Sequence, residues 1–373
     1  MNVVVTGIGL ISALGNLETT WKGLLSSQSR ILPYQPFPEL LTQPLALIHD
    51  IPSHPTELLE KAITDALMMA DLTPPLPDCG VVIGSSRGYQ GKLEQLARGE
   101  ENINLIKFRD YLHFNIAVNA AKKIGSTGII VSPMAACATG IWAIAQGLEL
   151  IQTQQCQRVI VGAVEAPITP LTLAGFEQMG ALAKTGCYPF DRNREGFVLG
   201  EGAAILILES EDLAQQRKAQ IYGKILGFGL TNDAAYSNKP DFNQKSAIAA
   251  IKTCLKNSHL SPDKINFIHA HGTATALNDD YEVKLIQQLF PQGVSVSSTK
   301  GATGHTLGAS GSLGVAFGLM ALNYQLLPPC VGLKNPEFDL DFVTSVRSSF
   351  VRNTLCFSFG FGGQNAIIAL GKP

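Results

Sequence analysis

Short apolar runs rich in β-branched residues alternate along the chain with longer segments of helical periodicity. Several runs are apolar at every position, which is typical of strands in a sheet covered on both faces. The expected strands are Val3–Gly7, Gly80–Gly84, Gly128–Ser132, Arg158–Ala163, Ala203–Leu208, Lys224–Leu230, Asn266–His271, Val294–Ser298, Asn353–Phe359 and Asn365–Leu370. The expected helices are Glu57–Ala70, Thr139–Gln152, Asn243–Asn257, Asp280–Leu289 and Gly308–Leu322. This alternation predicts an α/β protein.

A polar stretch, Glu209–Gln220, separates two successive groups of these elements. We therefore expect two halves, residues 1–215 and 216–373, and a chain of 373 residues is long enough for both to have a core. The apolar N-terminus lacks the basic start of a signal peptide. No stretch approaches the roughly 20 apolar residues that span a bilayer, so we expect no membrane span.

Composition narrows the class of protein. Hydrophobic residues make up 46% of the chain and charged residues 16%, with a net charge of −2, which does not suit a nucleic-acid-binding protein. The seven cysteines are scattered without a C-x-x-C pair. This argues against a disulfide framework and a thiolate zinc site, and favours a reducing cytoplasm.

The opening segment, Thr6-Gly-Ile-Gly-Leu-Ile-Ser12, invites comparison with a dinucleotide-binding fingerprint because it follows a strand. The third glycine is replaced by Ser12, and no acidic residue ends a second strand at the expected spacing. A tight glycine turn after the first strand is the better interpretation. The hypothesis of a dinucleotide-binding oxidoreductase has no support beyond this segment.

The segment Met134-Ala-Ala-Cys-Ala-Thr-Gly140 joins an apolar run to a helical pattern. Cys137 should therefore lie near a helix N-terminus, where free N–H groups and the helix dipole favour a thiolate. Its small neighbours would let a thioester approach the sulfur. A buried structural cysteine is the competing interpretation, and this segment alone does not decide between them.

Two histidines end another expected strand, in Ile268-His-Ala-His-Gly-Thr-Ala-Thr275. A histidine that leaves a strand into a Gly-Thr turn is well placed to point into a crevice. A metal site built from His269, His271 and His305 lacks convincing ligand spacing, so no metal is expected. We expect His269 to be a packed or hydrogen-bonded core residue.

Two glycine-rich segments follow strands in the second half. In Ser297–Ala309, Lys300 precedes the glycines instead of following them, so a phosphate loop is excluded, and His305 lies before a helix rich in Gly and Ala. In Leu355–Asn365 a strand runs into a glycine loop, either as a simple bulge or hairpin turn or with Phe361 as a movable side chain above a site.

Taken together, these segments resemble the β-ketoacyl-[acyl-carrier-protein] synthases, of fatty-acid or polyketide type. The resemblance covers nearly the whole chain and is densest from about Gly128. It includes the segment Pro189–Gly202, which is similar to the one that closes the family's first half. The family's catalytic set appears in family order: Cys137, then His271 in His-Gly-Thr-x-Thr, then Lys300 and His305 in Lys-x-x-x-Gly-His.

The resemblance implies a thiolase fold, in which two similar α/β halves form five αβαβα layers, and normally a homodimer. It implies a decarboxylative Claisen condensation between an acyl group held on Cys137 and a malonyl thioester, with both substrates carried on the phosphopantetheine of an acyl carrier protein and no further cofactor. In this family the backbone N–H groups of Cys137 and Phe361 would form an oxyanion hole. His271 and His305 would stabilise the enolate.

The resemblance also implies supporting roles. Lys300 would hold the polar network through a carboxylate, with Asp279 and Glu282 as the candidates. The remaining implied residues are Thr273 and Thr275 for the pantetheine arm, Phe190, Arg87 and Gly360 for the acyl substrate, and Arg194 for docking of the carrier.

Four features depart from the family pattern. Arg87 stands where fatty-acid members have a small or aliphatic residue of the acyl tunnel, and an unpaired charge there would disfavour a long chain. Gly314 replaces a glutamate common in fatty-acid members, and Gln364 replaces a threonine. The basic segment that docks the carrier is shortened to Ser53–Lys61.

Two related functions remain open. A non-catalytic partner subunit that sets chain length usually lacks the nucleophile, whereas Cys137 is present. A coenzyme A thiolase would have a second cysteine in the last glycine loop, but Cys356 lies in the strand before it.

Overall fold

The computed structural model describes residues 1–100, 108–236 and 238–373. A mixed sheet runs through it in the order β13-β11-β10-β15-β16-β9-β1-β8-β7-β5-β6, with β2 paired to β1. Its strands are β1 (Val3–Ser12), β2 (Gly15–Asn16), β5 (Gly80–Gly84), β6 (Ile130–Val131), β7 (Arg158–Glu165), β8 (Gly202–Ser210), β9 (Gly223–Asn232), β10 (Phe267–His269), β11 (Ser295–Ser297), β13 (Asp341–Phe342), β15 (Asn353–Gly360) and β16 (Gln364–Gly371). Two small sheets pair β3 (Leu32–Tyr34) with β4 (Gln43–Leu45), and β12 (Leu326–Leu327) with β14 (Arg347–Ser348).

The two parts of the large sheet repeat one topology. In the order β6-β5-β7-β8-β1, the first three strands are parallel and the last two pairings are antiparallel. The order β11-β10-β15-β16-β9 has the same directions. Residues 3–5 of β1 pair with residues 223–225 of β9 and join the parts into one sheet. The boundary at residue 215, which falls inside a short helix (α8), stays a prediction.

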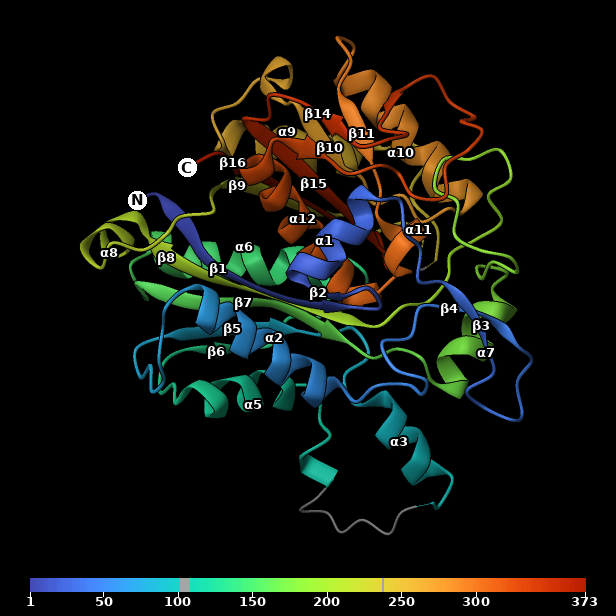
Figure 1. The fold of residues 1–373 in the computed structure, drawn as a ribbon, viewed down its shortest axis with the longest axis horizontal. Coiled ribbons are helices and arrows are strands. Elements are labelled where there is room, and N and C mark those ends of the chain that lie inside the picture. Colours follow the sequence, from blue (N-terminus) through green and yellow to red (C-terminus); the bar gives the residue numbers. More distant parts are fainter. Residues whose placement is uncertain (101–107, 237) are drawn as a thin grey trace.

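Helices separate and cover the two parts of the sheet, as Figure 1 shows. Helices α2 and α5 cover the outer face of the first part, α6 and α12 lie between the parts, and α9 and α10 cover the second. The helices are α1 (Leu17–Leu25), α2 (Pro55–Met69), α3 (Gln90–Ala97), α5 (Asn115–Ile124), α6 (Thr139–Gln152), α7 (Pro170–Gln178), α8 (Glu211–Gln216), α9 (Lys245–Asn257), α10 (Ala276–Leu289), α11 (Lys300–Thr303) and α12 (Ser310–Tyr324). The expected five layers are confirmed. Within the described ranges, no helix is long and apolar enough to cross a membrane.

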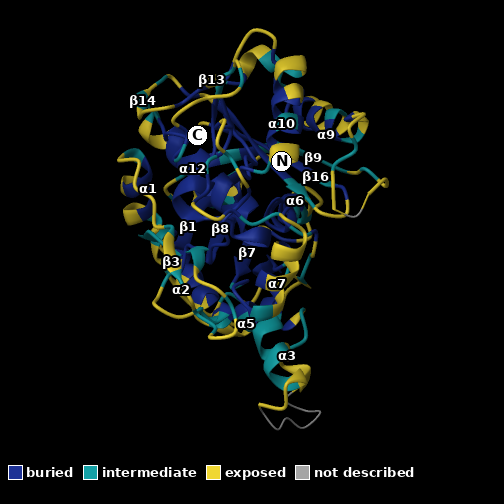
Figure 2. Cartoon of the chain, turned by 90° about the vertical axis from the view of Figure 1, so that its right-hand side faces the viewer, coloured by how far each residue is buried: buried dark blue, intermediate teal, exposed yellow. Residues whose placement is uncertain are grey.

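Sandwiched between helices, the central strands are buried on both faces. Every residue of β1 and β8 is buried, as is all of α12 from Ser310 to Leu322, and these elements form the dark interior of Figure 2. Both-face burial explains why their sequences lack alternation.

The glycines near the N-terminus lie inside β1, so the prediction of a turn after residue 7 is wrong. The strand continues to Ser12. A Cβ on Gly7 would lie 2.3 Å from the carbonyl oxygen of Ala66, and one on Gly9 would lie 1.8 Å from that of Ala62. The glycines therefore let helix α2 approach the strand, and the dinucleotide-binding interpretation fails with the turn.

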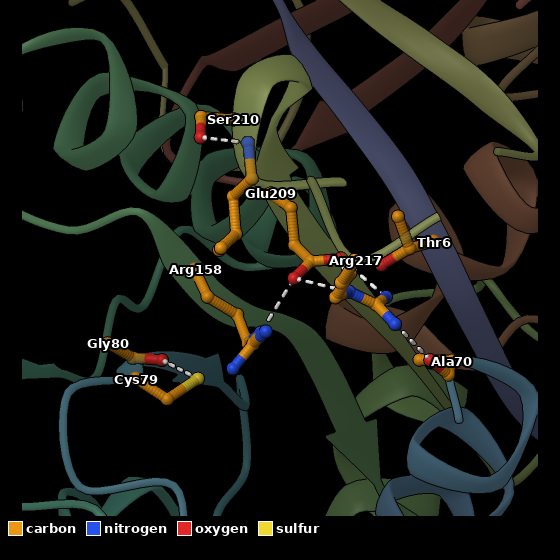
Figure 3. A network of polar contacts seen from close by, with 9 residues as sticks. Thr6, Ala70, Cys79, Gly80, Arg158, Glu209, Ser210 and Arg217 are labelled. Carbon is orange, nitrogen blue, oxygen red and sulfur yellow. Dashed lines mark hydrogen bonds and ion pairs between the residues drawn. The ribbon is translucent and has the colours of Figure 1, made fainter. Parts of the chain in front are cut away.

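A buried carboxylate ties the first-half strands together at the end of the sheet where β7 begins (Figure 3). Glu209 of β8 is fully buried and accepts hydrogen bonds from Thr6, Arg158 and Arg217, of which the Arg158 bond is 2.8 Å long. Arg217 also donates to the carbonyl of Ala70 at the end of α2. The network thus links β1, β7, β8 and α2 at one point.

Candidate active site

The nucleophile candidate lies at a strand-to-helix turn, as the sequence predicts. Cys137 follows β6 and precedes the first residue of α6, with Ala138 as the N-cap. The preceding residue, Ala136, has a φ of 47°, in the left-handed region that side chains rarely adopt. Ser358 of β15 donates a hydrogen bond of 2.8 Å to the carbonyl of Cys137. The second half therefore holds the turn in place.

The charge state of Cys137 depends on its burial as well as on the helix N-terminus. Burial raises the pKa of the Cys137 thiol to about 12, although the positive charge of Lys300 lowers it. Desolvation of the sulfur therefore outweighs the nearby favourable charge and disfavours ionisation of the thiol. The preference of the helix end for a thiolate stays a prediction, which burial opposes.

His305 contacts the nucleophile directly. Its Nε2 lies 3.2 Å from the Cys137 sulfur, and its Nδ1 lies 2.8 Å from the Ser310 hydroxyl. Its backbone N–H donates to the carbonyl of Val198, and its carbonyl accepts from the N–H of Gly200. Burial, and then the charge of Lys300, hold the pKa of His305 well below its usual value, so the imidazole is neutral.

His271 lies beside His305, with ring centroids 5.4 Å apart. The ammonium of Lys300 donates to the carbonyl of His271 and lies 3.5 Å from its Nδ1. Burial, then the charge of Lys300, hold the pKa of His271 well below its usual value. Burial lowers the pKa of Lys300. In its charged form the lysine can only donate, which makes Nδ1 the acceptor and puts the proton of the neutral ring on Nε2.

The two predicted supporting carboxylates hold the turn that carries His271. Glu282 accepts from the backbone N–H groups of His271 and Gly272 at 2.6 and 2.7 Å. Asp279 accepts from the N–H groups of Phe190 and Ala274. Burial raises the pKa of Glu282 to about 7 and that of Asp279 to about 6.

The resemblance implied that Lys300 holds the polar network through a carboxylate, whereas its ammonium contacts His271 in the structure. Glu282 binds the backbone of the same turn. The link between Lys300 and a carboxylate, which the resemblance implied, runs through His271.

These groups open onto one cavity of about 510 Å³. Its wall includes residues predicted for catalysis and substrate binding, namely Cys137, His271, His305, Thr273, Thr275, Gly360 and Phe361. The hydroxyls of Thr273 and Thr275 are 2.9 Å apart, and that of Thr275 also caps α10. The two hydroxyls and the Cys137 sulfur thus face the same cavity.

The glycine loop between β15 and β16 lines the cavity beside Cys137. A Cβ on Gly360 would lie 2.8 Å from the carbonyl oxygen of Ala135 and 3.2 Å from the Cys137 nitrogen, so only glycine allows this approach. Phe361 is 38% exposed, and its ring centroid lies 6.2 Å from that of Phe176. The loop is both a hairpin turn and part of the site.

The side chains of two predicted site residues are buried. Phe190 is fully buried in the core of the second half, stacked on Phe342, so its predicted contact with the acyl substrate is wrong. The side chain of Arg194 is only 6% exposed and is ion-paired with Asp280 and Glu337. Arg194 also lines the cavity, and its role in docking the carrier stays a prediction.

Arg87 is half-buried beside the cavity wall. Its guanidinium lies 5.2 Å from the ring centroid of Phe176 and 3.4 Å from the Gln90 side-chain oxygen. Phe176 lines the cavity with Cys137. Direct contact between Arg87 and an acyl chain stays a prediction.

His269 is a packed core residue, as predicted. Its Nε2 lies 3.1 Å from the Thr299 hydroxyl, and burial lowers its pKa to about 3. A Cβ on Gly314 would lie 2.7 Å from the Nδ1 of His269, so the imidazole takes the space that a side chain at 314 would need. In residues 1–100, 108–236 and 238–373, no three His, Cys, Asp or Glu side chains are grouped as metal ligands.

Sequence reasoning missed three residues of the site. Ser310 faces His305, Ser358 holds the Cys137 carbonyl, and Glu165 ends β7 as a fully buried carboxylate. A charged residue closing an otherwise apolar strand was a signal for Glu165. The two serines have no comparable signal, because only the fold brings them to their partners.

Known protein families match most of this chain. The family models described as Beta-ketoacyl synthase, N-terminal domain and Beta-ketoacyl synthase, C-terminal domain match residues 54–214 and 222–334. Curated relatives named 3-oxoacyl-[acyl-carrier-protein] synthase 2 include one from Synechocystis sp., 34% identical over 99% of this chain and 98% of its own, and one from Coxiella burnetii, 31% identical over 99% and 98%.

Solved structures show the same fold. A ketosynthase bound to a hexaketide, in complex with its type II polyketide acyl-carrier protein, has a TM-score of 0.93 at 27% identity and covers 100% of this chain and 99% of its own. The ishigamide ketosynthase/chain length factor has a TM-score of 0.92, also at 27% identity, with coverage of 100% and 99%. The expected thiolase fold is therefore confirmed, and the chain belongs to the β-ketoacyl synthase family.

Proposed function

We propose that this protein is an acyltransferase that condenses an acyl group held on Cys137 with a malonyl thioester on an acyl carrier protein, giving a 3-oxoacyl thioester. The observation that carries the proposal is the pair of neutral, buried imidazoles, His271 and His305, beside the Cys137 sulfur in one cavity. A neutral imidazole keeps one N–H group, which it can donate to an oxyanion.

In the first step the Cys137 sulfur attacks the acyl thioester. A new C–S bond forms, the bond to the pantetheine sulfur breaks, and the proton of the thiol ends on the departing sulfur. The tetrahedral oxyanion would be stabilised by the backbone N–H groups of Cys137 and Phe361, the latter in the loop above the sulfur. The acylated enzyme then accepts the second substrate, as in other covalent relays.

In the second step the malonyl thioester loses its carboxylate as CO₂, and the electron pair moves onto the thioester carbonyl. Lys300 at Nδ1 keeps the His271 proton on Nε2. The Ser310 hydroxyl, by donating to Nδ1, does the same for His305. The two Nε2–H groups then bind the enolate oxygen, its carbon attacks the acyl-Cys137 carbonyl, and the thiolate that leaves takes up a proton.

The substrate carrier and its arm fit the polar side of the cavity. Thr273 and Thr275 would donate to the amide oxygens of the pantetheine, and Gln364 lies at the same wall. The reaction as written needs no cofactor beyond the arm of the carrier. The seven cysteines are free thiols, which suits the reducing cytoplasm in which we place the reaction.

We further propose a homodimer formed through β6. In the second half, the strand at the corresponding edge, β11, is covered by β13, whereas β6 ends the sheet. Ile129, Ile130 and Met134 at this edge are 36%, 41% and 66% exposed. An exposed apolar strand edge is a template for pairing. Light scattering should give a dimer for the native protein and a monomer for Ile130→Lys, and a native monomer would contradict the interface.

The competing activities fit the site less well. A non-catalytic partner would not need Cys137 within 3.2 Å of His305. The second cysteine that a coenzyme A thiolase would need has no counterpart, because Cys356 is 1% exposed and directs its thiol to the carbonyl of Gly314.

Mass spectrometry of the intact protein after incubation with a panel of acyl carriers tests the proposal. We expect one added acyl group on the native protein, none on Cys137→Ala, and a 3-oxoacyl carrier once malonyl carrier is added. Acylation of another residue, or product without malonyl carrier, would contradict it.

A further inference from the structure

One buried carboxylate near the active site has no role in the reaction described above. Glu165, the last residue of β7, is fully buried and accepts five hydrogen bonds. Three of them join it to the turn after β5 and to the second half: Ser85 Oγ donates at 2.5 Å, the N–H of Arg87 at 3.0 Å and the N–H of Gly308 at 2.9 Å. The other two come from the N–H and hydroxyl of Ser86.

The second-half partner, Gly308, lies between His305 and its hydroxyl partner Ser310. A Cβ on Gly308 would lie 2.5 Å from the Glu165 oxygen and 2.9 Å from the Ser86 nitrogen. The carboxylate thus occupies the space of a side chain at 308. A shift of Gly308 would move both ends of the His305–Ser310 contact.

The same carboxylate acts on the nucleophile through its charge. The negative charge of Glu165 raises the pKa of the Cys137 thiol in addition to burial, while the charges of Lys300 and Arg87 lower it. Charges buried near the site are weakly screened by solvent, so a single carboxylate has a measurable effect on its neighbour.

We propose that Glu165 is a positioning residue that fixes the His305–Ser310 segment against the turn after β5. This inference rests on the proposed function for the role of His305. Glu165 belongs to the first half and holds the segment between His305 and Ser310 of the second half. This contact couples the two halves at the point where the reaction occurs.

Two substitutions separate the geometric role from the electrostatic role. Glu165→Gln keeps the size but removes the charge and presents an amide group to donors. Glu165→Asp keeps the charge but shortens the side chain by one methylene, so that it cannot reach Ser86 and Gly308 together. The matched control is Glu209→Gln, which neutralises another buried carboxylate of the first half. This control lies far from the site, because Glu209 binds Arg158 at the opposite end of β7 from Glu165. At 3.3 Å per residue the two ends of the strand are about 23 Å apart.

The first measurement is the rate at which iodoacetamide alkylates Cys137, followed by mass spectrometry of the Cys137 peptide between pH 7 and 9. We expect Glu165→Gln to raise this rate about tenfold, because removing a nearby like charge lowers a thiol pKa by about one unit. Glu165→Asp and Glu209→Gln should match the native protein. This measurement needs no carrier protein, so it tests Glu165 even if the proposed function fails.

The second measurement is CO₂ release from malonyl carrier. Both Glu165 variants should lose about a hundredfold, as small displacements of catalytic groups do, whereas Glu209→Gln should keep the native rate. Native alkylation and native decarboxylation in folded Glu165→Gln would overturn the proposal, as would an equal alkylation change in Glu209→Gln. If Glu165→Gln does not fold, a native decarboxylation rate in Glu165→Asp overturns it. Absence of CO₂ release by the native protein would instead refute the proposed function.

Discussion

Replacement of His305 by alanine tests the division of the reaction into two steps. Its Nε2–H would be one of two donors to the enolate oxygen, and it lies 3.2 Å from the sulfur that holds the acyl group. Loss of one oxyanion donor costs about 3 kcal/mol, which corresponds to roughly a 150-fold slower step. We expect His305→Ala to be acylated at Cys137 and to decarboxylate malonyl carrier at this reduced rate.

A graded variant makes the prediction sharper. Ser310→Ala leaves the imidazole in place and removes the 2.8 Å contact at Nδ1 that selects the tautomer. The net value of a hydrogen bond is about 1 kcal/mol, so this variant should decarboxylate roughly fivefold more slowly than the native protein. His271→Ala, which removes the other donor, should resemble His305→Ala.

The assay follows the two steps separately. Acylation is read from the mass of the intact protein, and decarboxylation from release of labelled CO₂ in a single turnover. A His305→Ala protein that decarboxylates at the native rate but is not acylated would refute the reasoning. A loss in Ser310→Ala as large as that in His305→Ala would show that the serine does more than select the tautomer.

The remaining predictions concern the nucleophile, the acyl pocket and stability. Cys137→Ala should abolish acylation and condensation, and iodoacetamide should label Cys137 fastest because it is the cysteine that lines the cavity; equal labelling of several cysteines, with full activity of the variant, would contradict its role. Arg87→Ile should extend the accepted chain length if the guanidinium beside Phe176 meets the acyl chain, and identical profiles of acylation rate against chain length would leave it structural. Glu209→Gln should lower the free energy of unfolding at neutral pH by about 3 kcal/mol, measured by urea denaturation, because two half-buried arginines lose their buried partner. Burial alone would raise the pKa of Glu209, but hydrogen bonds from Arg217, Thr6 and Arg158 outweigh it and the pKa is lowered; the stabilisation is therefore present above the unfolded pKa near 4.5 and lost as pH falls through the folded value, so the two proteins should converge in acid.

The sequence by itself determined the elements whose pattern is local. The strand 80–84 and the helix 139–152 were predicted with the bounds that the structure has, because both-face burial and helical periodicity are written in consecutive residues. The helix α3 was missed, since it has no buried residue and therefore no apolar face to reveal it. The order of Cys137, His271, Lys300 and His305 indicated the chemistry before any contact was known.

Only the tertiary structure decided what those residues experience. Arg194 is a basic residue in the sequence, but Asp280 and Glu337 from the second half bury and neutralise it. Cys137 lies near a helix N-terminus, yet burial among distant segments raises the pKa of its thiol and so opposes the local preference for a thiolate. Desolvation and charge pairing depend on every atom within a few ångströms, whatever its distance along the chain. For that reason a sequence can specify which groups reach the site but not the charge that each carries there.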